Sequence, residues 1–100
     1  MKKPNYADFG NVTDAKIKEL FTEIDSLNID FNQIEEKFIK GSGKGGQKIN
    51  KTNNAVMLIY KPLKIIIKCQ RERSRAVNRF IALRTLVEKI KGKQDNNFGL

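Results

Sequence analysis

The sequence AVMLIYKPLKIIIKCQ at residues 55–70 contains two apolar runs separated by a proline. Each run, residues 55–61 and residues 64–70, has the length and the branched or aromatic composition of a β-strand. Pro62 cannot donate a hydrogen bond in a central ladder, so Pro62-Leu63-Lys64 marks the turn between the strands. This stretch therefore predicts a hairpin at the centre of a small, mostly antiparallel sheet.

Side chains in the second strand alternate between two faces. Ile65, Ile67 and Cys69 share one face, while Lys68 points to the other. Cys69 is therefore predicted to be a core thiol and not a reactive one. It is the only cysteine, and the chain has no histidine. A disulfide within the chain, a thiol–histidine pair and a zinc cluster are thus excluded, and no metal or cofactor is expected.

The hairpin is followed by a predicted helix. Ser74 is a suitable N-cap for residues 75–91, and Gly92 is a natural C′ residue. Arg75, Asn78 and Arg79 fall on its outer faces. Its core stripe is Ala76, Phe80, Leu83, Val87 and Ile90. Residues 93–100 are expected to form a short, frayed C-terminal tail.

An amphipathic helix is predicted before the hairpin, at residues 13–27, with Thr13 as its N-cap. Its apolar stripe is expected to pack on the domain core, although a partner's groove is an alternative. Residues 30–36 fit either a short helical turn or a strand, and residues 38–39 a short strand. Residues 1–11 form a loose, flexible lead-in. The chain is thus an α+β protein with a single domain at residues 12–92.

A glycine-rich stretch, GSGKGGQ at residues 41–47, lies between the short strand and the hairpin. Glycine permits close approach of the backbone to another molecule, so the stretch indicates a binding loop or a mobile surface loop. It matches the dinucleotide pattern G-x-G-x-x-G, but no acidic residue occurs from Gly46 to Arg71, and that pattern requires one. The Walker pattern fails as well, because Gln47 stands where it requires lysine.

The charge of the chain is unevenly distributed. Residues 1–36 have a net charge of −4, residues 37–75 a net charge of +10, and residues 76–100 a net charge of +3. A block this basic favours a nucleic-acid or membrane surface over a solvated face. No apolar run reaches the ~18 residues of a membrane span and no secretory signal is present, so we expect a cytoplasmic protein without a membrane partner.

The residues around the glycines resemble a known family. Gly45-Gly46-Gln47, then Ile49-Asn50-Lys51-Thr52, a hairpin, and finally Cys69-Gln70-x-x-Arg73-Ser74-x-x-x-Asn78 are similar to the catalytic domain of class I peptide-chain release factors. The resemblance covers about residues 34–91. It is nearest to the short ribosome-rescue factors of the mitochondrial type, which lack a codon-reading domain.

The resemblance implies peptidyl-tRNA hydrolysis on the large ribosomal subunit. In that family the Gln backbone amide stabilises the transition state, so Gly45, Gly46 and Gln47 are the expected catalytic residues. Gln47 is also a candidate for N-methylation by a methyltransferase. Peptidyl-tRNA and ribosomal RNA are the expected partners, together with a second protein that senses tRNA or mRNA. The expected RNA-binding residues are Lys40, Lys44, Lys48, Lys51, Lys68, Arg71, Arg73, Arg75 and Arg79.

Several positions depart from the family pattern. Lys48 and Ile49 replace the usual His-Val, Met57 replaces a common arginine, and Pro62-Leu63-Lys64 replaces Pro-Thr-Gly. The expected activity is release without a codon, because 100 residues leave no room for a codon-reading domain. The alternative is a module that binds ribosomal or other structured RNA, retains the fold and does not catalyse hydrolysis.

Overall fold

A three-stranded antiparallel sheet forms one layer of the protein, as seen in a computed structural model that describes residues 1–39 and 55–98. The short turn η4 (Lys61–Leu63) joins the second and third strands, and Lys64 follows it with a φ of 54°. Both strand pairs are antiparallel, which confirms the hairpin. The strands, in sheet order, are β1 (Ile34–Ile39), β2 (Ala55–Tyr60) and β3 (Ile65–Cys69).

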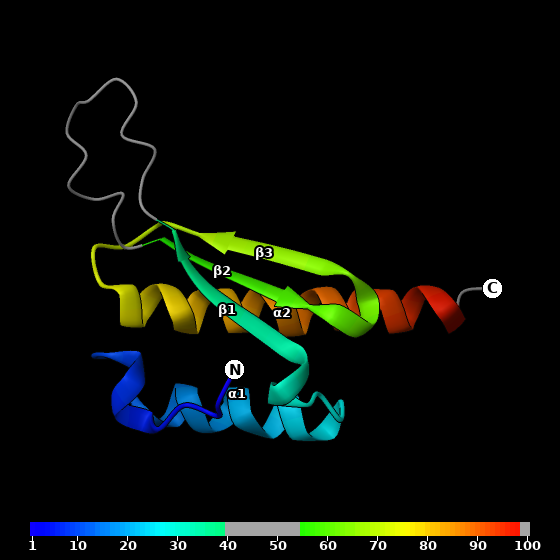
Figure 1. Cartoon of the computed structure of the whole chain (residues 1–100). Coiled ribbons are helices and arrows are strands. Elements are labelled where there is room, and N and C mark those ends of the chain that lie inside the picture. The colour runs from blue at the N-terminus through cyan, green and yellow to red at the C-terminus, as the bar shows by residue number, and fades with distance from the viewer. Residues whose placement is uncertain (40–54, 99–100) are drawn as a thin grey trace.

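Two helices complete the fold. Helix α2 (Arg75–Phe98) lies along one face of the sheet, and α1 (Asp14–Ser26) lies on the side of α2 that faces away from the sheet (Figure 1). The order of layers is therefore sheet, α2, α1. This arrangement confirms the α+β class, with a packed C-terminal helix and an additional N-terminal amphipathic helix.

The alternation of side chains in β3 places its core residues against α2. Ile65, Ile67 and Cys69 are buried, whereas Ile66 is 60% exposed on the open face of the sheet. In the partner strand, Val56 and Leu58 are fully buried. Cys69 is therefore a core thiol, as the alternation predicts.

Helix α1 forms as the sequence predicts. The Thr13 hydroxyl oxygen accepts a hydrogen bond from the Lys16 N–H at 3.4 Å, which caps the helix. Ile17, Leu20 and Ile24 are buried in the common core, so the apolar stripe packs on the domain and not on a partner. The helix ends before Asn28, which has a φ of 58° that a continuing helix would not allow.

The segment expected to form a lead-in, residues 1–11, contributes buried side chains to the fold. They contain the 3₁₀ turn η1 (Tyr6–Phe9), and Phe9 is fully buried. Its ring lies 5.9 Å from the ring of Phe21 and 6.0 Å from the ring of Phe80. A lone aromatic residue gives no periodic signal, and for this reason the sequence does not show that Phe9 joins the core.

Both interpretations of residues 30–36 apply, one after the other. Asp30 caps a 3₁₀ turn, η2 (Phe31–Gln33), through a 2.9 Å hydrogen bond from the Asn32 N–H. Strand β1 then begins at Ile34, so it is longer than the strand predicted at residues 38–39.

Helix α2 begins as predicted and ends later than predicted. The Ser74 hydroxyl oxygen accepts a hydrogen bond from the Val77 N–H at 3.2 Å, and the stripe residues Phe80, Leu83, Val87 and Ile90 are buried. The prediction of Gly92 as the C′ residue is wrong, because the helix continues through Phe98. Lysines on both sides of Gly92 and the following glutamine are good helix formers, and they offset the cost of about 1 kcal/mol for one glycine.

Candidate nucleic-acid interface

The glycine-rich stretch connects two paired strand ends. Ile39, the last residue of β1, pairs with Ala55, the first residue of β2. Residues 40–54 therefore leave and rejoin the sheet at the same place. Seven of the predicted site residues lie in this stretch and outside the described residues: Lys40, Lys44, Gly45, Gly46, Gln47, Lys48 and Lys51.

The connection from β3 to α2 lies at the same end of the sheet. Cys69 pairs with Val56, next to the start of β2, and Figure 1 shows the chain turning there into α2. This connection has exposed Arg71 and Arg73 side chains, and exposed Arg75 follows at the first position of α2. Three of the predicted RNA contacts are thus gathered beside the ends of the glycine-rich stretch.

Lys68 occupies a different face. It is exposed on the open side of the sheet, where it pairs across the strands with Met57, and Met57 pairs in turn with Lys37. The two lysines therefore flank Met57 on the face that α2 does not cover. The expected RNA contact of Lys68 would therefore lie on that face of the sheet and not on the connection between β3 and α2.

A buried asparagine holds the connection in shape. Asn78 is fully buried, and its Oδ1 accepts hydrogen bonds from the Glu72 N–H at 2.9 Å and from the Cys69 thiol at 3.4 Å. Its Nδ2 donates to the Glu72 carbonyl oxygen at 3.0 Å. One side chain thus satisfies both backbone groups of Glu72, the residue between Arg71 and Arg73. The placement of Asn78 on an outer helix face is wrong.

Arg79 differs from the exposed arginines in its surroundings. Its side chain is only 17% exposed, and its Nε donates to Glu36 Oε2 at 2.7 Å. A second donor, Nη1, reaches the Asp8 carbonyl oxygen at 2.8 Å. The guanidinium of Arg79 therefore makes contacts within the fold.

Phe38 and Glu36 are site residues that sequence reasoning missed. Phe38 is 47% exposed, and the Arg75 guanidinium lies 4.2 Å from the centre of its ring. Such a stack holds an arginine in one orientation. The alternation of side chains along a strand could have revealed them. Ile34, Glu36 and Phe38 share the face that meets α2, and an acidic residue at the middle of that face requires a basic partner.

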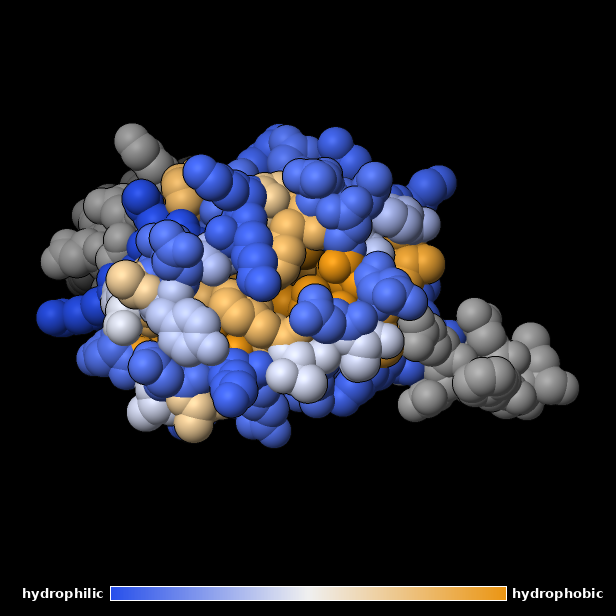
Figure 2. Space-filling model, turned by 90° about the horizontal axis from the view of Figure 1, so that it is seen from below, coloured by the Kyte–Doolittle hydropathy of each residue, from blue (hydrophilic) through white to orange (hydrophobic). Residues whose placement is uncertain are grey.

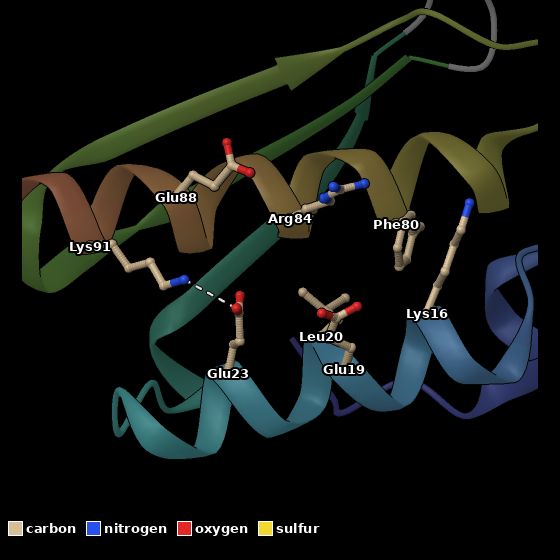
Figure 3. A pocket seen from close by; sticks show the side chains of 8 residues that line it. All are labelled: Lys16, Glu19, Leu20, Glu23, Phe80, Arg84, Glu88 and Lys91. Atoms are coloured by element: carbon tan, nitrogen blue, oxygen red, sulfur yellow. Dashed lines mark hydrogen bonds and ion pairs between the residues drawn. The ribbon is translucent and has the colours of Figure 1, made fainter.

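The groove between α1 and α2 is a poorer candidate for binding RNA. Leu20 and Phe80 line it, and three basic and three acidic side chains surround them (Figure 3). Glu23 and Lys91 form an ion pair across it at 3.0 Å. In the view from below Figure 1, with α1 nearest the viewer, hydrophobic residues lie in the middle of the face and hydrophilic residues surround them (Figure 2). Balanced charges of this kind do not attract phosphate in particular.

Comparison with known proteins identifies the family. The family described as the RF-1 domain matches residues 22–98, which is most of the chain. The chain therefore belongs to the release-factor family defined by that domain. The match includes the glycine-rich stretch, the sheet, the connection bearing the arginines and α2. Within the described residues, no helix has both the length and the apolar character that a membrane crossing requires.

The curated relatives are translation factors. The human protein named mitochondrial translation release factor in rescue is 47% identical over 64 residues, which are 64% of this chain and 39% of that protein. Peptide chain release factor 1 of Corynebacterium aurimucosum is 44% identical over 64 residues, 64% of this chain and 18% of that protein. The chain thus spans from about a fifth to two fifths of the length of these relatives.

Proposed function

We propose that this protein releases nascent peptides from peptidyl-tRNA on the large ribosomal subunit and that it does so without reading a codon. The family match supports the reaction, and the human relative that is named for rescue supports the codon-independent form. The protein would thus act as a ribosome-dependent ester hydrolase in the rescue of stalled translation. We place it in the cytoplasm, as the sequence suggests.

The proposed chemistry requires no titratable side chain. Ester hydrolysis develops negative charge on the former carbonyl oxygen, and a preorganised N–H donor at such a site is worth about 10²–10³ in rate. The Gln47 backbone amide is the proposed donor, and Gly45 and Gly46 would let it enter a crowded RNA pocket without Cβ atoms. A chain without histidine can therefore catalyse acyl transfer to water.

The position of the GGQ sequence relative to the arginines gives the strongest support for the proposal. The GGQ sequence lies between the paired residues Ile39 and Ala55, and the β3–α2 connection with Arg71 and Arg73 lies at the same end of the sheet. A catalytic loop would thus leave the fold beside cations that can bind ribosomal RNA phosphates. Methylation of Gln47 and a second protein that senses tRNA or mRNA remain parts of the proposal.

Peptide release tests the proposal directly. Ribosomes with peptidyl-tRNA, with and without mRNA beyond the P site, and free large subunits with peptidyl-tRNA are the three substrates. We expect release without a stop codon, and free large subunits should be at least as good a substrate as whole ribosomes. Gly46→Ala should lower release more than Gln47→Ala, because the glutamine variant keeps its backbone N–H.

Three results of the release assay would contradict the proposed function or part of it. If the parental protein and both variants release peptide at the same rate as buffer, while ribosome binding persists, the protein is an RNA-binding module without catalytic activity. If both variants match an active parent, the GGQ residues do not carry the reaction. Strong dependence on a stop codon contradicts the codon-independent form.

A further inference from the structure

The end of β1 that leads into the glycine-rich stretch is attached to α2 by side chains. Glu36 and Phe38 project from the same face of β1, because alternate residues of a strand share a face. Arg75 and Arg79 project from the same side of α2, because residues four apart are neighbours on a helix. Glu36 bonds to Arg79 and the Phe38 ring stacks against Arg75, so the helix holds the strand at two consecutive points.

Arg79 is the centre of this attachment. Its bond to Glu36 is short and mostly shielded from water, because the two side chains are 17% and 14% exposed. It also bonds to the Asp8 carbonyl oxygen, and its guanidinium lies 5.8 Å from the centre of the Phe38 ring. Arg79 therefore joins three segments: the N-terminal turn, β1 and α2.

The position of β1 in the sheet explains why such an attachment matters. Within the described sheet β1 is an edge strand that pairs only with β2, whereas β2 pairs with strands on both sides. The end of the glycine-rich stretch that enters β2 is therefore held by two ladders, and the end that leaves β1 is held by one. The side-chain contacts with α2 supply the second support for β1.

We propose that Glu36 and Arg79 are positioning residues that fix the direction in which the GGQ loop leaves the sheet. This inference rests on the proposed function of the loop. It gives Arg79 a role different from the RNA contact expected from the sequence, because its Nε and Nη1 donate within the fold and its side chain is only 17% exposed. The direction of β1 sets where the loop begins, and misplacement of a reacting group by about 1 Å can cost ~100-fold in rate.

The test uses three single variants and one double variant in the peptide-release assay. Glu36→Gln removes the negative charge of the pair. Arg79→Lys keeps the positive charge but removes the forked set of donors of the guanidinium. We expect each to lower kcat by ~10- to 100-fold while the ribosome concentration at half-saturation stays unchanged. The double variant should be no worse than the poorer single variant, because the two residues act through one bond.

Glu23→Gln is the matched control. It breaks another carboxylate–cation pair, which joins Glu23 of α1 to Lys91 of α2 at 3.0 Å and includes no residue of β1. Its kcat should equal that of the parent. Amide hydrogen exchange gives a readout besides activity: residues 36–39 should exchange faster in Glu36→Gln than in the parent, and Glu23→Gln should leave them unchanged.

Each alternative gives a different result. If Arg79 binds RNA, Arg79→Lys raises the half-saturating ribosome concentration, and Glu36→Gln lowers that concentration because it frees the guanidinium. If the pair serves stability alone, both variants lower the melting temperature. At assay temperatures well below that melting temperature, both keep the parental kcat. Either pattern overturns the inference and leaves the proposed function intact. A parental protein without release activity overturns both.

Discussion

At the scale of single residues, Asn78 shows how a motif residue can act without touching the substrate. It lies in the motif that relates this chain to release factors, yet it is fully buried. Its side-chain amide holds the connection between β3 and α2 in place, because it forms hydrogen bonds with both backbone groups of Glu72. Polar groups buried in this way are costly to leave without partners.

Replacing Asn78 should therefore weaken the fold. Asn78→Ala removes three hydrogen bonds and leaves the Glu72 N–H without its partner, so we expect a loss of ~1–3 kcal/mol in the free energy of unfolding. Urea denaturation measures the loss. Asn11→Ala changes an exposed asparagine and should stay within about 0.5 kcal/mol of the parent. Equal stability of both variants would show that the bonds to Glu72 contribute nothing.

At the scale of elements, the glycines at positions 10 and 92 contrast in backbone and surroundings. Gly10 follows η1 with a φ of 71°, and a Cβ there would lie 3.3 Å from the Ala76 Cβ. Gly92 lies inside α2, and among the described residues an added Cβ there would meet no atom within 4 Å apart from the adjoining helix backbone. The first position requires glycine, and the second tolerates it at a cost.

Alanine substitution should change stability in opposite directions at these two positions. Gly92→Ala should raise the free energy of unfolding by ~0.5–1 kcal/mol, because alanine is the better helix former. Gly10→Ala should lower it by about 1 kcal/mol or more, because its φ disfavours a side chain. Thermal and urea unfolding of both variants decide this. Destabilisation by Gly92→Ala would indicate that the helix ends there, as the sequence suggests.

The elements also show which features a sequence can reveal. Periodic signals predicted α1, the hairpin and the start of α2, because each buries a regular stripe against the core. Features that depend on single long-range contacts escaped prediction. Phe9 gives no periodic signal, and the bond between Glu36 and Arg79 joins residues 43 positions apart. The sequence identified basic residues as candidates for the site. It could not show which arginines face outward, because that depends on tertiary packing.

At the scale of the whole molecule, acidic and basic side chains gather in different places. Described acidic residues are concentrated on α1 and the segments around it, while Arg71, Arg73 and Arg75 lie at the end of the sheet next to the glycine-rich stretch. An anionic partner such as ribosomal RNA therefore attracts one end of the protein more strongly than the α1 side.

This separation predicts a specific salt dependence. Affinity for ribosomal RNA should fall linearly on a log–log plot, with a slope of roughly −0.7 to −0.9 for each phosphate contact. Arg71→Ala and Arg73→Ala should each reduce the steepness by about one contact, and Arg84→Ala, in the groove between the helices, should leave it unchanged. Binding measured from low to high salt gives the slopes. Flattening by Arg84→Ala alone would place the RNA on the α1 side.

The pairing of Ile39 with Ala55 has an evolutionary consequence. Because an antiparallel pair already brings these two residues together, the sheet closes the chain across residues 40–54 whatever their sequence. The described core takes its side chains from elsewhere in the chain. Selection can therefore rewrite the loop with little effect on folding. Descendants of such a domain can acquire or lose a reaction while inheriting the same scaffold.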